Sequence, residues 1–321
     1  MLTRRTFVAS LGALCATPQY ASPSLAAGPM PTTAVDFDVP RGACDTHVHV
    51  IGDPAQFPMS RQRDYTPPIA TAGDLRRMMG FLKLDRVVIV TPTVYDADNS
   101  ATLAAIKELG PDRARGVALI DEAAPPSVLD SLKEGGIAGV RLLLSGSAAM
   151  HREATAKRIE AAIDLAQARQ WHLDIEAPPD AVAAVAPQLA SSPAPLVFDY
   201  FAWLAGGVEE PGFDAVASLV KSGHAYVKFA EPYRLSKRAP DYDNLKPVVE
   251  ALLAANPDRV LWGSGWPHVD SSSVPGRART DPAPNLPVDA GHLLNLLADW
   301  VPDAVTRRKI LVDNPARLYR F

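Results

Sequence analysis

Short apolar runs alternate with stretches of helical periodicity along the chain from Arg41 onward. Runs of β-branched and apolar residues predict strands, whereas apolar positions that recur every three or four residues predict amphipathic helices. Eight segments predict strands: ACDTHVHV (43–50), DRVVIVTP (85–92), RARGVALI (113–120), AGVRLLL (138–144), WHLDIEA (171–177), PLVFDYF (195–201), AYVKFAE (225–231) and DRVLWGS (258–264). This alternation is typical of a parallel sheet built from strand–helix units.

Helices are predicted between these strands and after the last one. Their ranges are 72–82, 99–109, 125–134, 154–169, 179–189, 213–222 and 243–255, followed beyond a proline-rich loop by 288–300 and 302–312. The rival fold, a doubly wound open sheet, carries glycine-rich phosphate-binding motifs after its strands, and neither G-x-G-x-x-G nor G-x-x-x-x-G-K-[ST] follows a strand here. Eight strand–helix units therefore predict an α/β fold of the (β/α)8 (TIM) barrel class, with residues 41–321 forming one domain.

The first 27 residues differ in kind from the rest. Paired arginines, Arg4 and Arg5, precede an apolar run and then small residues that end at Ala27. This order is typical of a cleavable export signal, and the start TRRTFV resembles a twin-arginine signal. We predict that residues 1–27 are removed after passage through the twin-arginine export machinery, that 28–40 form an N-terminal extension, and that the protein resides in the periplasm.

Composition and charge narrow the classes of partner. The chain has 47% hydrophobic and 21% charged residues and a formal net charge of −4, which becomes −6 without the predicted signal. Such a chain has no basic surface for nucleic acid. No segment after the signal approaches the ~18 apolar residues of a membrane span. Cys15 leaves with the signal, so Cys44 has no partner for a disulfide and is predicted to be buried.

Chemically versatile residues gather at the predicted carboxyl ends of the strands, where barrel enzymes place their chemistry. His47 and His49 alternate on the first strand, so their side chains share one face, which suits either a metal ion or an anionic ligand. Other residues at strand ends are Thr91, Thr93, Arg141, Asp174, Glu176, Asp199, Tyr200, Lys228, Glu231, Ser264, Gly265 and His268. This collection predicts a site for a polar, anionic small molecule.

An ordered set of motifs resembles the amidohydrolase superfamily, and within it the branch of 2-pyrone-4,6-dicarboxylate lactonase and sugar-lactone hydrolases. The motifs are DTHVH, TPTVYDADNSATL, GVRLLL, WHLDI, YVKFAEPYRLS, DRVLWGSGWPH and ILVDNPARLYRF. The resemblance runs from Gly42 to Phe321. It implies a barrel enzyme that hydrolyses a lactone without a metal.

The resemblance also implies roles for individual residues. Arg141 and Arg234 would grip substrate carboxylates, which suits the planar fork of a guanidinium. His47 and His49 would be the first-strand pair, and Tyr65 would occupy a lid position. Further site residues implied by the resemblance are Lys228, Tyr233 and His268.

Two positions depart from the family pattern. Tyr200 stands where the sixth strand usually ends in histidine, and Gly265 stands where the eighth usually carries an aspartate. That aspartate is expected to activate water or bind metal. With both replaced, only His47 and His49 remain of the usual protein ligands, fewer than the three that a catalytic zinc needs. We therefore predict no metal cofactor, with zinc as the less favoured alternative.

Another carboxylate must then act as the base. Glu176 and Asp174 alternate on the fifth strand, and Glu176 is the favoured candidate, with Asp270 and Glu231 as others. The competing interpretation makes these acids ion-pair partners of the site's cations. The predicted catalytic residues are His47, His49, Lys228, Glu176 and His268, and the predicted substrate-binding residues are Tyr65, Arg141, Asp174, Tyr200, Tyr233 and Arg234.

These predictions combine into a periplasmic, metal-independent hydrolase of a carboxylated lactone or related cyclic ester, whose partner is a small carboxylate or lactone. In this scheme His47, His49 and Lys228 polarise the carbonyl oxygen. Two alternatives stay open: a barrel that binds an organic acid without hydrolysing it, and a lactone isomerase. If the two departures have weakened hydrolysis, restoring Gly265→Asp and Tyr200→His should raise it.

Overall fold

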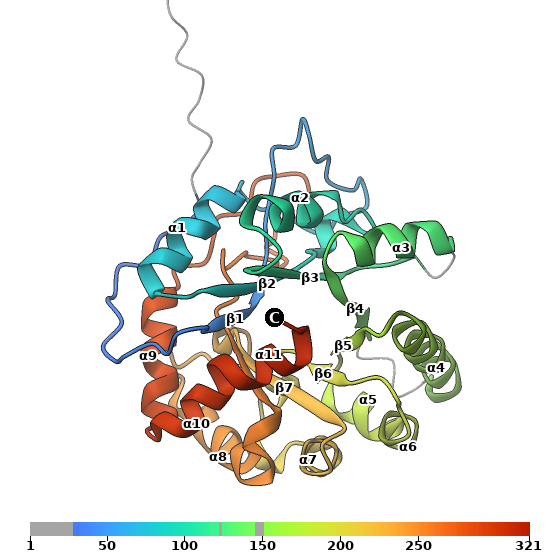
Figure 1. Cartoon of the computed structure of the whole chain (residues 1–321), viewed down its shortest axis with the longest axis vertical. Coiled ribbons are helices and arrows are strands. Elements are labelled where there is room, and N and C mark those ends of the chain that lie inside the picture. Colours follow the sequence, from blue (N-terminus) through green and yellow to red (C-terminus); the bar gives the residue numbers. More distant parts are fainter. Residues whose placement is uncertain (1–27, 122–123, 145–150) are drawn as a thin grey trace, which may run out of the picture.

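A computed structural model describes residues 28–121, 124–144 and 151–321. Eight parallel strands follow one another around a barrel in sequence order (Figure 1). They are β1 (Cys44–Val48), β2 (Arg86–Val90), β3 (Ala114–Ala118), β4 (Ile137–Leu143), β5 (His172–Glu176), β6 (Leu196–Phe198), β7 (Ala225–Ala230) and β8 (Val260–Gly263). Backbone bonds from Gly265 N–H to His47 O (2.9 Å) and from His49 N–H to Trp266 O (2.8 Å) close the ring. The predicted barrel class is confirmed.

Helices follow the strands and cover the outside of the barrel (Figure 1). They are α1 (Ala72–Leu82), α2 (Ser100–Leu109), α3 (Pro126–Glu134), α4 (Arg152–Arg169), α5 (Pro179–Ala184), α6 (Ala186–Ala190), α7 (Phe213–Lys221), α8 (Lys246–Ala255), α9 (Ala290–Trp300), α10 (Ala304–Arg308) and α11 (Asn314–Tyr319). In these described residues no helix is long and apolar enough to cross a membrane.

Two predicted helices are each divided. The segment predicted over 179–189 breaks at Val185, because Pro187 lies in the first turn of α6 and offers no backbone N–H to continue α5. The last predicted helix consists of α10, a π-helical turn over Lys309–Asp313 and α11, so it extends beyond 312. A proline again lies in the first turn of α11.

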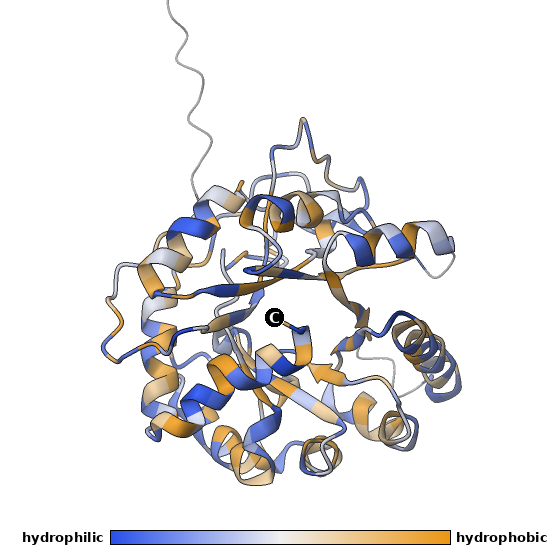
Figure 2. Cartoon of the chain, viewed as in Figure 1, coloured by the Kyte–Doolittle hydropathy of each residue, from blue (hydrophilic) through white to orange (hydrophobic). Residues whose placement is uncertain are grey.

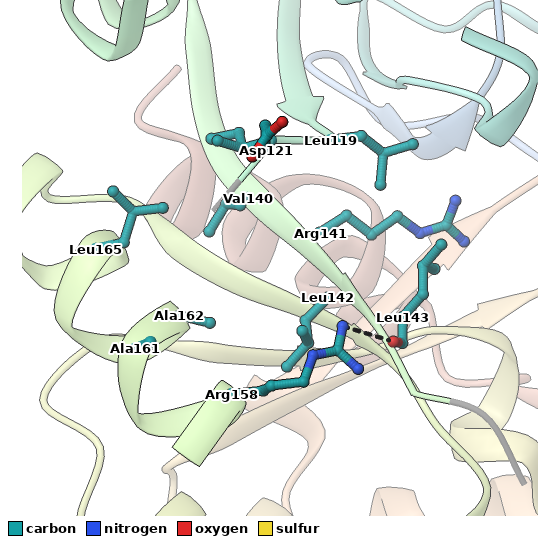
Figure 3. Close-up of a pocket in the computed structure, with 11 residues that line it drawn as sticks. Leu119, Asp121, Val140, Arg141, Leu142, Leu143, Arg158, Ala161, Ala162 and Leu165 are labelled. Carbon is teal, nitrogen blue, oxygen red and sulfur yellow. Dashed lines mark hydrogen bonds between the residues drawn. The ribbon is translucent and has the colours of Figure 1, made fainter. Parts of the chain in front are cut away.

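The core lies between the sheet and the helices, and apolar positions dominate the strands in Figure 2. All four residues from Val87 to Val90 are buried, as expected of a strand covered on both faces. A cavity of about 400 Å³ remains between β4 and α4. Figure 3 shows Leu142, Ala162 and Leu165 lining it, while the guanidinium of Arg141 extends away from α4. Alternation along β4 thus sends Arg141 toward the barrel interior.

The N-terminal extension is tied to the barrel next to β8 and α9. The Trp266 indole N–H donates to Pro29 O (2.7 Å), and the Asp289 carboxylate accepts hydrogen bonds from Thr32 and Thr33. The predicted signal, residues 1–27, lies outside the described residues.

Candidate active site

A small polar cavity opens at the carboxyl ends of the strands. Its volume is about 80 Å³, and its lining is His49, Tyr65, Pro92, Thr93, Arg141, Glu176, Tyr200, Arg234 and Ser271. It therefore brings together six of the residues predicted to be catalytic or substrate-binding: His49, Tyr65, Arg141, Glu176, Tyr200 and Arg234. This volume holds a few water molecules, so a ligand of substrate size requires the surrounding loops to move.

A cluster of charged side chains lies beneath the cavity wall. Lys228 is fully buried, pairs with Asp174 Oδ2, and its Nζ lies 3.0 Å from Asp199 Oδ1. Arg141 Nη2 continues the chain of alternating charges, at 2.9 Å from Asp199 Oδ2 and 2.8 Å from Glu176 Oε2. Lys228 and Asp174 are not among the residues that line the cavity, and Lys228 lies between Asp174 and Asp199 and pairs with both.

The two aspartates that share Lys228 differ in their tendency to ionise. Burial favours the neutral acid in both. In Asp199 the cations Lys228 and Arg141, together with His47, outweigh burial and hold the pKa well below its usual value. In Asp174 burial and the charge of Asp199 prevail and raise the pKa to about 7. Asp199 is therefore the carboxylate that keeps its charge.

Neighbouring polar groups orient the imidazole rings of the two site histidines. His49 Nδ1 lies 2.7 Å from Val90 O, so the proton is on Nδ1 and Nε2 is an acceptor. His47 Nδ1 faces two charged groups, Asp199 Oδ1 at 3.1 Å and Lys228 Nζ at 3.4 Å. Burial lowers the pKa of both rings, that of His49 to about 3. Burial therefore disfavours the imidazolium form of both rings, and His49 Nε2 carries no proton with which to polarise a carbonyl oxygen.

Glu231 occupies the space that a side chain at position 265 would need. A Cβ built on Gly265 lies 2.2 Å from Glu231 Cγ and 2.7 Å from its Cδ. Glu231 follows β7 in the left-handed backbone region (φ 52°), which swings its side chain under the β8 loop. An aspartate at position 265 would therefore compete with Glu231 for this space, which bears on the expected gain from Gly265→Asp combined with Tyr200→His.

The Glu231 carboxylate is poised between a cation and the histidines. Oε2 accepts a hydrogen bond from Arg234 Nε, while Oε1 lies 3.7 Å from His47 Nε2. Oε1 is buried and has no hydrogen-bond partner among the described residues. Burial opposes ionisation, but Arg234 and the imidazoles prevail and lower the pKa of Glu231. Glu231 is thus an ionised acceptor with one free oxygen next to the histidine pair.

Residues 44–321 match the amidohydrolase family model. The chain belongs to the amidohydrolase family, as the sequence motifs predicted. This amidohydrolase is 35% identical over 301 residues to 4-sulfomuconolactone hydrolase from Rhizobium radiobacter. The match covers 91% of this chain and 95% of the relative. It is also 30% identical to D-galactarolactone isomerase from Agrobacterium fabrum, in a match that covers 90% of this chain and 94% of that relative. An apo crystal structure from Agrobacterium tumefaciens matches with a TM-score of 0.75 and 27% identity, over 90% of this chain and 99% of that one.

Three donor atoms of this amidohydrolase meet in a way that fits a metal ion. Ligand atoms of His47, His49 and Glu231 all lie within 4.8 Å of one another. Two imidazoles and one carboxylate are a donor set that catalytic zinc uses. Glu231 thus supplies the third ligand that sequence reasoning found missing.

Tyr233 and Asp270 lie outside the cavity lining, whereas Glu176 is part of it. Tyr233 OH lies 3.3 Å from His268 Nδ1 and 3.4 Å from Gly265 O, behind the wall. Asp270 pairs with Arg277 Nη1 at 2.8 Å. Glu176 does line the cavity and its side chain is 29% exposed, but it is bound to Arg141 and burial raises its pKa. Asp199, which the final sequence prediction left out, is the centre of the charge cluster; its place at the end of β6 was the available signal.

Proposed function

We propose that this amidohydrolase hydrolyses a lactone that carries an anionic group, with water activated by Glu231 and without a metal ion. The substrate class rests on relatives named for lactone chemistry, one of them for a sulfonated lactone. The observation that carries the mechanism is the free Oε1 of Glu231, an ionised and buried acceptor in the space left by Gly265.

Cations in the cavity wall suit an anionic lactone. Arg234 and Arg141 both line it, together with the Tyr65 phenol. Arg141 Nε–H is buried and has no acceptor among the described residues, so it leaves a donor for the ligand. We assign Arg234 and Tyr65 to the anionic substituent. Arg141 then stabilises the oxyanion that develops on the lactone carbonyl.

Water fits between the acceptors of the histidine pair and Glu231. One water O–H donates to Glu231 Oε1 and the other to His49 Nε2. Glu231 takes a proton as the oxygen attacks the lactone carbonyl carbon. Because Lys228 is neutralised by Asp174 and Asp199 behind the wall, it orders this arrangement and does not polarise the substrate carbonyl.

A divalent metal held by His47, His49 and Glu231 would act as a Lewis acid and lower the pKa of a bound water. Metal independence is supported by an alternative that satisfies the same atoms: the Tyr200 hydroxyl lies 3.2 Å from His47 Nε2, which leaves His49 and Glu231 to share a water. Periplasmic location is supported by the N-terminal sequence and belongs to the same proposal.

Purified protein incubated with carboxylated and sulfonated lactones tests the function. We expect ring opening, followed as acid release, at the same rate before and after treatment with a chelator. Activity that a chelator abolishes and zinc restores would replace the metal-free mechanism. Thermal stabilisation by these lactones without turnover would show a binding protein instead.

Isomerisation is the second candidate, since one relative is named an isomerase. Attack by a substrate hydroxyl in place of water would move the acyl group and leave the mass unchanged. NMR of the product distinguishes the two outcomes in one experiment.

A further inference from the structure

Tyr200 follows β6 in an unusual backbone turn. Tyr200, Phe201, Ala202 and Trp203 all have φ between 50° and 57°, so four consecutive non-glycine residues are left-handed. Each is less stable than the same residue in the right-handed form. Stacking of Phe201 on Phe229, with ring centroids 5.0 Å apart, helps to offset that cost. The turn sends two adjacent side chains, Asp199 and Tyr200, into the site.

The Tyr200 hydroxyl connects the cavity to the buried histidine. It accepts a hydrogen bond from Arg141 Nη2 at 2.8 Å and lies 3.2 Å from His47 Nε2. Because the Tyr200 hydroxyl oxygen already accepts from Arg141, its own proton can be directed to His47 Nε2 or to a ligand in the cavity. Asp199, His47 and Tyr200 therefore form a line of polar contacts that ends at the cavity wall.

Two guanidinium groups flank the phenol ring. The Arg234 and Arg141 guanidinium carbons lie 5.1 Å and 5.8 Å from its centroid. A phenolate formed here would be stabilised by both cations. The ring is also part of the cavity lining, so its hydroxyl can reach a bound ligand.

We propose that Tyr200 donates the proton to the ring oxygen that leaves when the lactone opens, and that His47 returns a proton to Tyr200. This assignment rests on the proposed hydrolysis and adds the acid that the ring opening needs. An alkoxide is a poor leaving group, so protonation of the ring oxygen as the C–O bond breaks lowers the barrier.

The protons balance across one turnover. Water loses one proton to Glu231 as its oxygen bonds to the carbonyl carbon. The tetrahedral adduct collapses, the bond between the carbonyl carbon and the ring oxygen breaks, and that oxygen takes the Tyr200 proton. The proton on Glu231 passes to His47 Nε2, 3.7 Å away in this structure, and from there to the Tyr200 phenolate. The products are one carboxylic acid and one alcohol.

Tyr200→Phe tests the proposal with two anionic lactones. The ring oxygen of one leaves as an aliphatic alcohol and that of the other as a phenol, which needs no proton donor. We expect Tyr200→Phe to lower kcat about 100-fold or more for the first and less than about fivefold for the second. Tyr319→Phe is the matched control, because Tyr319 is a buried phenol at the opposite end of the barrel; it should leave both rates within twofold.

The outcomes separate this proposal from the one it rests on. Equal loss on both lactones, with a normal melting temperature, would overturn the role of Tyr200 and leave hydrolysis intact. Full activity of Tyr200→Phe on the alcohol-forming lactone would overturn it as well. Wild-type protein that opens neither lactone would instead refute the proposed function.

Discussion

Two buried histidines at opposite ends of the barrel show how partners decide what an imidazole does. His172 begins β5 at the closed end, packs edge-on against Tyr319 with centroids 5.1 Å apart, and fits because Gly139 has no side chain. In the described residues it makes no ion pair, and burial lowers its pKa to about 3. His47 is equally buried, but it lies between Asp199, Tyr200 and Glu231. Both rings are buried, but only His47 is in contact with charged groups and proton carriers. His47 lies at the carboxyl ends of the strands, which we call the mouth.

Left-handed backbone also shapes the carboxyl ends of β6 and β7. Tyr200 and Glu231, the residues that bring the phenol and the carboxylate to His47, both have left-handed backbone angles directly after their strands. Strained residues persist where the surrounding structure holds them, and they concentrate at functional sites. Strain and charge therefore occur together at the mouth. Mutations there should differ from mutations at the closed end in their effects on stability and on kcat.

Removing the buried cation should give the largest effect on stability. Lys228→Met leaves Asp174 and Asp199 without their shared partner and should cost roughly 3–5 kcal/mol in the free energy of unfolding, measured by urea denaturation. Lys221→Met on the exposed surface of α7 is the control and should stay within about 0.5 kcal/mol. Equal effects would mean that the charge cluster is not what holds the mouth together.

Filling position 265 should come next. Gly265→Asp meets the Glu231 side chain and adopts a positive φ of 74°, so it should destabilise the protein by about 2–4 kcal/mol. Glu231→Ala in the same chain removes the collision with Glu231, while the contact with the Tyr233 hydroxyl, 2.5 Å from the built Cβ, remains. A double-mutant cycle should therefore give a favourable coupling of at least about 1 kcal/mol. Strict additivity would show that the two side chains do not compete for one space.

The pH profile should show which acid matters. Glu231 has a lowered pKa and is active as the carboxylate, so kcat/KM should stay level from about pH 6 to 8 and fall only below about pH 4.5, the usual value for a glutamate. His49, whose pKa is lowered to about 3, stays neutral over that range. An acid limb well above that of an ordinary glutamate would instead point to a carboxyl group whose pKa is raised by burial, such as Glu176.

The closed end should give the smallest effect on activity. His172→Leu replaces a ring whose nitrogens lack side-chain partners with an apolar group, so stability should change by no more than about 1–2 kcal/mol. The lactone kcat should stay within twofold of wild type. A loss of activity comparable to that of a mouth variant would remove the contrast between the two histidines.

Local pattern was enough for the elements that depend on local signals. Helix α1 was predicted with its observed bounds, because its periodicity begins at a capping box formed by Thr71 and Asp74. The strand predicted over 195–201 ends at Phe198, because a left-handed turn follows it. No glycine marks that turn in the sequence, so the local pattern did not predict it. Its form depends on packing against β7, which is distant in sequence.

The site was predicted in outline for the same reason. Strand ends located Arg141 and the histidine pair, and the family resemblance added Arg234. The choice of Glu176 as base over Glu231 was made without knowing which side chain fills the space at Gly265. That space is defined by contact between two loops 34 residues apart. Sequence order carries no signal for such a contact, so the structure was needed to find it.

Replacing each glutamate separately tests the central claim most directly. Glu231→Gln and Glu176→Gln both exchange a carboxylate for an amide of the same shape, and kcat on one anionic lactone can be compared with the melting temperature of each variant. If Glu231 is the base, Glu231→Gln should lose about 10²–10⁴-fold in kcat and Glu176→Gln less than about tenfold. The reverse order of losses, in variants that remain folded, would contradict the account.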